Sequence, residues 1–160
     1  MISLVRVDNR LIHGQVVEAW LPHLKVDRVA VADDEAAQNA LIRAAMGLAV
    51  QPSIEVMIQR VAELPWSRIV NDDVRTLVLV RDVKDAVEAS ARGLALHKLN
   101  LGNIHFATGR KQVSPSVYLS PEEVQQLADL AKQGVAVDAR GTPNDRAVTF
   151  EEIRERFEKA

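Results

Sequence analysis

The chain has 160 residues and no cysteine, which fits one domain and excludes disulfides, thiolate metal sites and cysteine nucleophiles. Hydrophobic residues make up 48% and charged residues 26%, the balance of a soluble globular protein. A net charge of −2 argues against a general nucleic-acid partner, and no apolar run approaches the roughly 20 residues that cross a bilayer. We therefore expect a cytoplasmic protein with no nucleic-acid partner and no direct membrane insertion.

Short β-branched runs alternate with helical patterns along the chain, which predicts an α/β domain with a mainly parallel sheet. Strands are expected at residues 2–7, 27–32, 53–58, 75–80, 98–101, 117–119 and 135–139. Helices are expected at residues 15–24, 33–48, 82–92, 120–133 and 151–159, the first of them ended or kinked by Pro22. Residues 59–69 fit neither pattern because Pro65 interrupts a possible helix. Residues 100–116 are too polar and irregular to be expected in the core.

Residues 8–15, Asp-Asn-Arg-Leu-Ile-His-Gly-Gln, form the loop after the first expected strand. Loops at the carboxyl ends of the strands border the ligand crevice of an open α/β sheet. His13 supplies a nitrogen nucleophile, and Arg10 supplies a permanently charged planar group that matches phosphoryl oxygens. Gly14 and Gln15 open the following helix, where free backbone amides favour an anion and the glycine allows close approach. The loop therefore indicates phosphoryl chemistry at His13, with Arg10, Gly14 and Gln15 as phosphate-binding residues.

Asp8 has two possible roles in this loop. Its carboxylate either accepts a hydrogen bond from one ring nitrogen of His13, which leaves the other nitrogen to attack, or pairs with Arg10 and shapes the loop. A lone loop histidine is more often structural than catalytic, so the residue types alone leave the role of His13 open. With a single glycine and no Gly-Lys-Ser/Thr ending, the loop is neither a P-loop nor a dinucleotide-binding turn.

Other polar and aromatic residues are more simply explained by structural roles. His105 could face the same crevice, although a hydrogen-bonded loop histidine is the simpler interpretation. Trp20 and Trp66 could anchor a protein interface, although the apolar spacing around Trp20 favours core packing. We expect neither a metal nor a cofactor. Helix capping and solvated turns explain the acidic residues that could suggest a magnesium site, which are Asp33, Asp34, Asp72 and Asp73.

The segment 6–16, Arg-Val-Asp-Asn-Arg-Leu-Ile-His-Gly-Gln-Val, resembles the phosphorylation-site segment of IIB subunits in the mannose/fructose/sorbose family of the bacterial phosphotransferase system (PTS). The resemblance extends over nearly the whole chain, through residues 31–35, 99–106, 117–120 and 143–145. It implies a single PTS IIB domain over residues 1–160. It also implies an open, mostly parallel twisted sheet with helices on both faces, in three layers.

The resemblance further implies that His13 accepts a phosphoryl group from the phosphohistidine of a IIA phosphocarrier. The group then passes to the sugar substrate at the permease formed by the IIC and IID membrane subunits. The implied activity is that of a protein-phosphohistidine–sugar phosphotransferase, with Arg10 and Asp8 as catalytic partners and phosphorylation on Nδ1. Both partners must reach His13, so we expect an exposed loop on a shallow surface, in a cytoplasmic protein peripherally associated with the permease. A monomer and a homodimer are both compatible with the family.

The sequence departs from the family pattern in two loops. Asn9 stands where the family commonly has a second Asp, which keeps a hydrogen-bonding group and removes a charge. Residues 33–34 are Asp-Asp where the family typically has an Asn. Two alternatives stay open: a regulatory phosphohistidine protein that uses the same site without direct sugar transport, and an α/β enzyme with a deep pocket for a phosphorylated metabolite.

Overall fold

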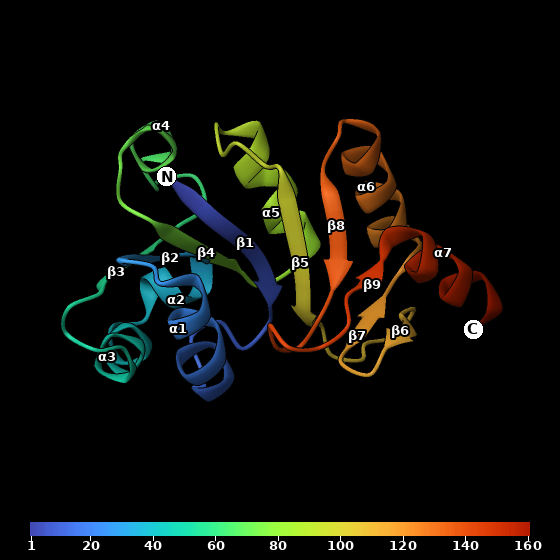
Figure 1. Cartoon of the computed structure of the whole chain (residues 1–160), viewed down its shortest axis with the longest axis horizontal. Coiled ribbons are helices and arrows are strands. Elements are labelled where there is room, and N and C mark those ends of the chain that lie inside the picture. Colours follow the sequence, from blue (N-terminus) through green and yellow to red (C-terminus); the bar gives the residue numbers. More distant parts are fainter.

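The computed structural model describes residues 1–160 and places seven strands in one sheet (Figure 1). The sheet order is β3-β2-β4-β1-β5-β8-β9, and every neighbouring pair is parallel except β8 and β9. The strands are β1 (Ile2–Asp8), β2 (Arg28–Ala32), β3 (Glu55–Gln59), β4 (Thr76–Val80), β5 (Lys98–Asn103), β8 (Ala136–Ala139) and β9 (Val148–Thr149). The expected open, mostly parallel sheet is confirmed.

Helices cover both faces of this sheet, as expected for a three-layer fold (Figure 1). They are η1 (Val16–Trp20), α1 (Leu21–Leu24), α2 (Asp34–Gln38), α3 (Ala40–Ala49), α4 (Trp66–Asn71), α5 (Val83–Ala91), α6 (Pro121–Lys132) and α7 (Phe150–Lys159). Buried residues of η1, α1 and α2 pack on one face of β1, β2 and β4, whereas those of α4, α5, α6 and α7 form the core on the other face. On the first face, no helix covers β5 and β8 (Figure 1). Asn100 of β5 and Asp138 of β8 hydrogen-bond to each other on that face.

The chain reverses its direction of travel across the sheet beside β1. After β1 it passes through η1, α1 and on to β2, whereas after β4 it crosses through α5 on the opposite face to reach β5, on the other side of β1. The carboxyl end of β1 therefore lies at a topological switch point, where open α/β folds bind their ligands. The loop 9–15 begins at this point.

The helical segments expected at 15–24 and 33–48 differ from the prediction. The first begins with the π-helical turn η1, in which the Leu21 N–H bonds to the Val16 carbonyl, and Pro22 falls in the first turn of α1, where helices tolerate proline. The second is two helices, because Asn39 has extended backbone and caps α3 by accepting a hydrogen bond from the Ile42 N–H at 3.1 Å. Helix-forming residues on both sides of Asn39 conceal this break in the sequence pattern.

The expectation that residues 100–116 lie outside the core was wrong. Leu101, Ile104 and Val113 are at most 1% exposed. The segment ends in β6 (Lys111–Ser114), which pairs with β7 (Val117–Leu119) as a separate antiparallel hairpin that the sequence pattern did not reveal. The short antiparallel strand β9 was also missed. In the ambiguous region, α4 begins directly after Pro65.

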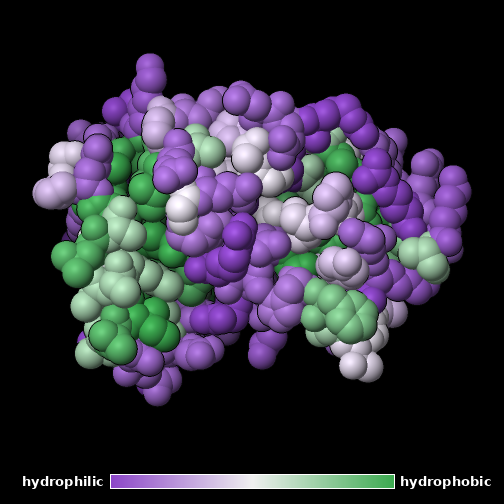
Figure 2. All heavy atoms as spheres, turned by 90° about the horizontal axis from the view of Figure 1, so that it is seen from below, coloured by the Kyte–Doolittle hydropathy of each residue, from purple (hydrophilic) through white to green (hydrophobic).

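The surface below the strand ends is hydrophilic at its centre and apolar on one side (Figure 2). The apolar side is the one on which α3 lies, and this helix has no buried residue (Figures 1 and 2). Its side chains Leu41 and Leu48 are 80% and 87% exposed. None of the helices combines the length and the apolar composition that a membrane span requires.

Candidate functional site

The site is built on a buried ion pair at the end of β1. Leu4, Arg6 and Asp8 alternate along one face of the strand, and the side chains of Arg6 and Asp8 are both 0% exposed. Arg6 Nη2 donates to Asp8 Oδ2 at 3.1 Å, and Arg6 Nη1 donates to Asn100 Oδ1 at 2.6 Å. Burial lowers the pKa of Arg6, and the carboxylate of Asp8 opposes that change. Removing either partner would leave the other charge buried and unpaired.

The register of the strands brings the partners of Arg6 to it. Arg6 lies opposite Asn100 of β5, and Asn100 lies opposite Asp138 of β8, where Asn100 Nδ2 donates to Asp138 Oδ1 at 2.9 Å. The carbonyls of Arg140 and Gly141, just after β8, each accept from Arg6 at 3.0 Å. A polar network therefore runs across three strands from the uncovered face of the sheet to Asp8.

A glycine and a tryptophan enclose the Arg6 guanidinium. The pairing of β1 with β5 shifts register between Val7 and Asp8, and Gly102 lies at this irregularity. A Cβ atom on Gly102 would lie 2.0 Å from Arg6 Cζ, so only glycine leaves room for the guanidinium. Trp20 lies on another side, with its ring centroid 4.9 Å from Arg6 Cζ and its Nε1 donating to the Gly141 carbonyl at 2.9 Å. Trp20 is 1% exposed, so its expected core role is confirmed.

The carboxylate of Asp8 performs both of the roles that the sequence left open. Its Oδ2 lies 2.9 Å from His13 Nε2, while its Oδ1 accepts the backbone N–H of Arg10 at 3.0 Å and lies 3.7 Å from Arg10 Nε. An ionised carboxylate only accepts hydrogen bonds, so Nε2 carries the imidazole proton. Nδ1 has no hydrogen-bond partner in the protein and keeps its lone pair.

The loop holds His13 through backbone geometry and burial. Leu11 has a φ of +56° and donates its N–H to the Asp8 carbonyl at 2.9 Å, which closes a tight turn. Leu11 and Ile12 then enter the core at 1% and 7% exposure, which offsets the strain of the left-handed residue. His13 itself is 15% exposed, more covered than the exposed loop that we expected.

Arg10, Gly14 and Gln15, the other residues expected to bind phosphate, lie in the same loop as His13. Arg10 is 48% exposed and donates from Nη2 to Gln15 Oε1 at 3.2 Å. With the Asn103 amide oxygen turned toward it, Arg10 Nε also donates there at 2.8 Å. Gln15 Oε1 also lies 3.4 Å from Arg6 Nη2, which leaves its amide nitrogen as the part suited to an anion. A Cβ on Gly14 would meet no atom within 4 Å, so the protein's own packing does not require this glycine.

His105 comes to the same edge of the sheet by a contact with the loop. Its Nδ1 is the partner of the Asn9 side-chain amide, so the interpretation of a hydrogen-bonded loop histidine is confirmed. Asn9, the position that departs from the family pattern, thus has a neutral amide where an Asp would place a charge against the ring. The side chain of Trp66 is 3% exposed, which excludes an interface role for it.

The acidic pairs that could have suggested magnesium are separate in space. Asp33 caps α2 by accepting the Ala36 N–H at 2.9 Å and pairs with Arg81, as the capping interpretation predicted. Asp72 pairs with the buried Arg28 and the chain's amino group. No group of three or more histidine or acidic side chains is arranged to hold a metal ion.

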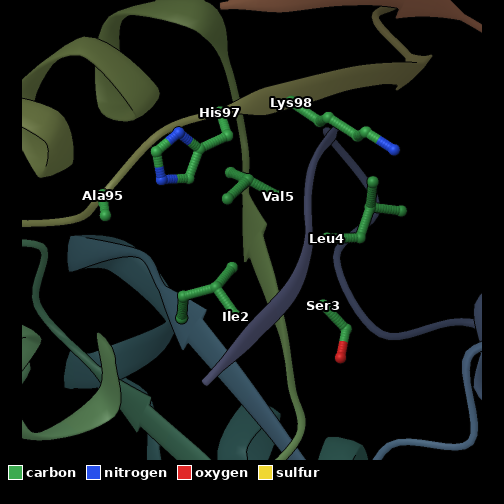
Figure 3. A pocket seen from close by; sticks show the side chains of 7 residues that line it. All are labelled: Ile2, Ser3, Leu4, Val5, Ala95, His97 and Lys98. Carbon is green, nitrogen blue, oxygen red and sulfur yellow. The ribbon is translucent and has the colours of Figure 1, made fainter. Parts of the chain in front are cut away.

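A cleft of about 270 Å³ at the amino end of β1 lies away from the site (Figure 3). It is lined by residues 2–5 of β1 and by Ala95, His97 and Lys98 at the start of β5. Since Asp8 is at the opposite end of β1, this cleft shares no residue with the His13 loop.

Comparison with known proteins decides the family. A family model described as the PTS system sorbose subfamily IIB component matches residues 2–160. The chain belongs to this family. The sorbose-specific EIIB component of Lacticaseibacillus casei is 29% identical over 147 residues, which cover 91% of this chain and 90% of that protein. A probable phosphotransferase enzyme IIB component of Streptococcus pyogenes is 32% identical over 139 residues, which cover 81% and 84%.

Solved structures agree with this IIB assignment. The IIB domain of the sorbose permease from Klebsiella pneumoniae superposes with a TM-score of 0.87 at 26% identity and covers 97% of each chain. The structure of manxB from Thermoanaerobacter tengcongensis gives a TM-score of 0.89 at 28% identity and covers 98% of this chain and 96% of that one.

The sequence patterns of this IIB chain indicated the loop but not the residues beneath it. These patterns predict no role in the site for Arg6, Asn100 or Gly102. One signal was present: a charged residue at position 6 of an otherwise apolar strand, two residues before Asp8 and therefore on the same face. The contacts to Asn100 and Gly102 depend on strand order and register, which the local pattern does not contain.

We expect Gly102→Ala to destabilise the protein by about 2 to 3 kcal/mol, because the new methyl group collides with the Arg6 guanidinium in a packed interior. Gly14→Ala is the matched control and should change the free energy of unfolding by less than about 0.5 kcal/mol, because its methyl group enters open space. Urea denaturation measures both. Equal stabilities for the two variants would contradict the described packing of Arg6.

Asp85, in the first turn of α5, predicts a pH dependence of stability. Burial and the carboxylates of Asp82 and Asp33 raise the pKa of Asp85 to about 7. Between its unfolded value of about 4 and this value the folded state holds a proton that the unfolded state has lost, so this group's contribution to stability falls as pH rises. Asp85→Asn should therefore raise the melting temperature more at pH 8 than at pH 5. Equal gains at both pH values would show that Asp85 titrates normally.

Proposed function

We propose that this chain is the IIB phosphocarrier of a sugar-transporting PTS. His13 accepts a phosphoryl group from a phosphorylated IIA protein and transfers it to the sugar bound by the IIC and IID membrane subunits. The observation that supports this most strongly is the hydrogen bond from His13 Nε2 to the buried Asp8, because it leaves Nδ1 free as a nucleophile.

The geometry favours a direct in-line transfer between two imidazoles. His13 Nδ1 attacks the phosphorus of the donor phosphohistidine, the new N–P bond forms, and the donor N–P bond breaks with its electron pair returning to the donor ring. Positive charge develops on the His13 ring as Nδ1 is phosphorylated while Nε2 keeps its proton. Asp8 stabilises that charge through the 2.9 Å contact.

Arg10 and the start of the helix neutralise the transferred group. Arg10 is half-exposed, and its Nε lies beside the Asp8 carboxylate that also contacts His13. The Nη groups of Arg10 can therefore turn toward phosphoryl oxygens while Nε stays beside Asp8. The open space at Gly14 accommodates the approaching partner. In the second transfer the N–P bond breaks, and the phosphorus joins an acceptor hydroxyl whose proton is taken by a base of the permease.

The comparisons support the partner assignment. Relatives that match more than nine-tenths of this chain are named as sorbose-, fructose- and N-acetylgalactosamine-specific components. The mannose-specific EIIAB component of Escherichia coli, of which the chain covers 50%, combines A and B components in its name. These names favour sugar transport over a purely regulatory role. We place the protein as one IIB domain, residues 1–160, on the cytoplasmic side of the permease.

His13→Ala should abolish phosphate acceptance from a phosphorylated IIA protein and cost only about 1 kcal/mol of stability, the size of one hydrogen bond. The measurement is acid-labile radiolabel on the purified chain, with thermal unfolding as the folding check. His97→Ala is the control, because this exposed histidine lies at the amino end of the sheet. Undiminished labelling of His13→Ala, or loss of label in His97→Ala, would refute the assignment.

A further inference from the structure

A cavity of about 410 Å³ lies beside the His13 loop, between that loop and the turn that follows β8. Arg10 and Gln15 line it from the loop, Arg140 and Asp145 from the turn, and Ser116 from the β6–β7 hairpin. Its volume falls within the range of small-molecule sites, roughly 300 to 1,000 Å³. His13 itself does not line this cavity, which therefore adjoins the place where the phosphoryl group is carried and shares Arg10 and Gln15 with it.

Arg140 gives the cavity an incompletely satisfied cation. A guanidinium has five N–H donors, yet the side chain of Arg140 makes one hydrogen bond, from Nη1 to the Pro143 carbonyl at 3.4 Å. Its Nε is buried without a hydrogen-bond partner, although Asp138 Oδ2 lies 3.2 Å away. A buried Nε is closed to a ligand, so an anion in the cavity would instead accept from the Nη groups of Arg140, which make only this one long hydrogen bond within the protein.

The other charges of the cavity also favour an anion. Arg10 lines the same space from the opposite wall, and Arg146 stands at its rim, paired there with Glu152 at 3.0 Å. Asp145 is the one carboxylate among the lining residues. The lining therefore holds three guanidiniums and one carboxylate, while the carboxylates that pair with these guanidiniums, Asp8, Asp138 and Glu152, are not among the lining residues.

Asp145 and the hydroxyl-bearing residues add a second kind of recognition. The backbone N–H of Thr142 donates to Asp145 Oδ2 at 2.9 Å and lowers the pKa of this carboxyl, which therefore remains an acceptor. The Ser116 hydroxyl donates to the Gly102 carbonyl at 2.8 Å and keeps an acceptor lone pair. Such acceptors suit the hydroxyl groups of a polyol, whereas inorganic phosphate alone would not use them.

We propose that this cavity binds the phosphate monoester of a sugar, with the phosphate between Arg10 and Arg140 and the sugar hydroxyls at Asp145 and Ser116. The identification of the ester as a sugar phosphate rests on the proposed function, because transfer to a sugar produces such a compound. Arg10 belongs to the His13 loop and also lines the cavity. An ester bound in the cavity therefore holds the Arg10 guanidinium away from the phosphoryl group that arrives at His13. Accumulated product thereby slows phosphate acceptance.

The site is tested by titrating the unphosphorylated protein with glucose 6-phosphate, fructose 1-phosphate, inorganic phosphate, glucose and fructose, while backbone amide shifts are followed by NMR. At least one hexose phosphate should bind about tenfold more tightly than inorganic phosphate, and the free sugars should not bind. Arg140→Gln should weaken that binding by about tenfold or more, which corresponds to the loss of a charge-assisted bond. Arg92→Gln, a surface arginine of the distant α5 end, and His13→Ala should both bind normally.

Three outcomes would overturn the site. They are no shifts at about 10 mM of any ester, equal affinity for inorganic phosphate and the esters (an adventitious ion only), or undiminished binding by Arg140→Gln.

A rate assay then tests the regulation, with each protein compared with and without ester. The bound ester should slow labelling of His13 at least about threefold in the native protein, and this slowing should vanish in Arg140→Gln. Binding without slowing would refute the regulation. Failure of His13 to accept phosphate at all would refute the proposed function and leave the binding result standing.

Discussion

The side chains of Arg6 and Asp8 are both fully buried, so each charge has lost its hydration and depends on the other. Replacing such a pair by apolar side chains is often neutral or stabilising, so its value here lies in the placement of Asp8. Gly102 leaves room for the guanidinium, and the carbonyls after β8 and the ring of Trp20 hold it in place. The ion pair thus holds the Asp8 carboxylate at the carboxyl end of β1, and that carboxylate orients the imidazole of His13.

Topology explains why this arrangement occurs where it does. The strand order reverses beside β1, so the loop after β1 meets the turn after β8 and the end of β5 at one edge of the sheet. Arg6 reaches residues more than 130 positions away in the chain by hydrogen bonds of 3.0 Å. The Arg6 guanidinium therefore holds two neighbouring parts of the site in place. These are the His13 loop and the turn after β8, which carries Arg140 and forms one wall of the cavity.

Sequence patterns predicted the strands and helices whose formation depends on residues close together in the chain. The buried apolar runs predicted most of the parallel strands, and the helix expected at residues 120–133 forms as α6, which begins with a capping box of Ser120 and Glu123. The break at Asn39 was not predicted because helix-forming residues surround it, and β9 and the β6–β7 hairpin were not predicted because their strands are short and irregular in pattern. In the site, the residue types of the loop indicated phosphoryl chemistry. The sequence could not predict that Oδ2 of Asp8 contacts His13 while Oδ1 contacts Arg10, because a carboxylate at this position can contact either residue.

The central claim is that Asp8 holds the proton of His13 on Nε2 and thereby directs chemistry to Nδ1. Long-range proton–nitrogen correlation NMR of the imidazole, recorded before and after reaction with a phosphorylated IIA protein, tests it most directly. We expect a neutral ring protonated on Nε2 before the reaction and a phosphoryl group on Nδ1 after it. A ring protonated on Nδ1, or a phosphoryl group on Nε2, would contradict the account.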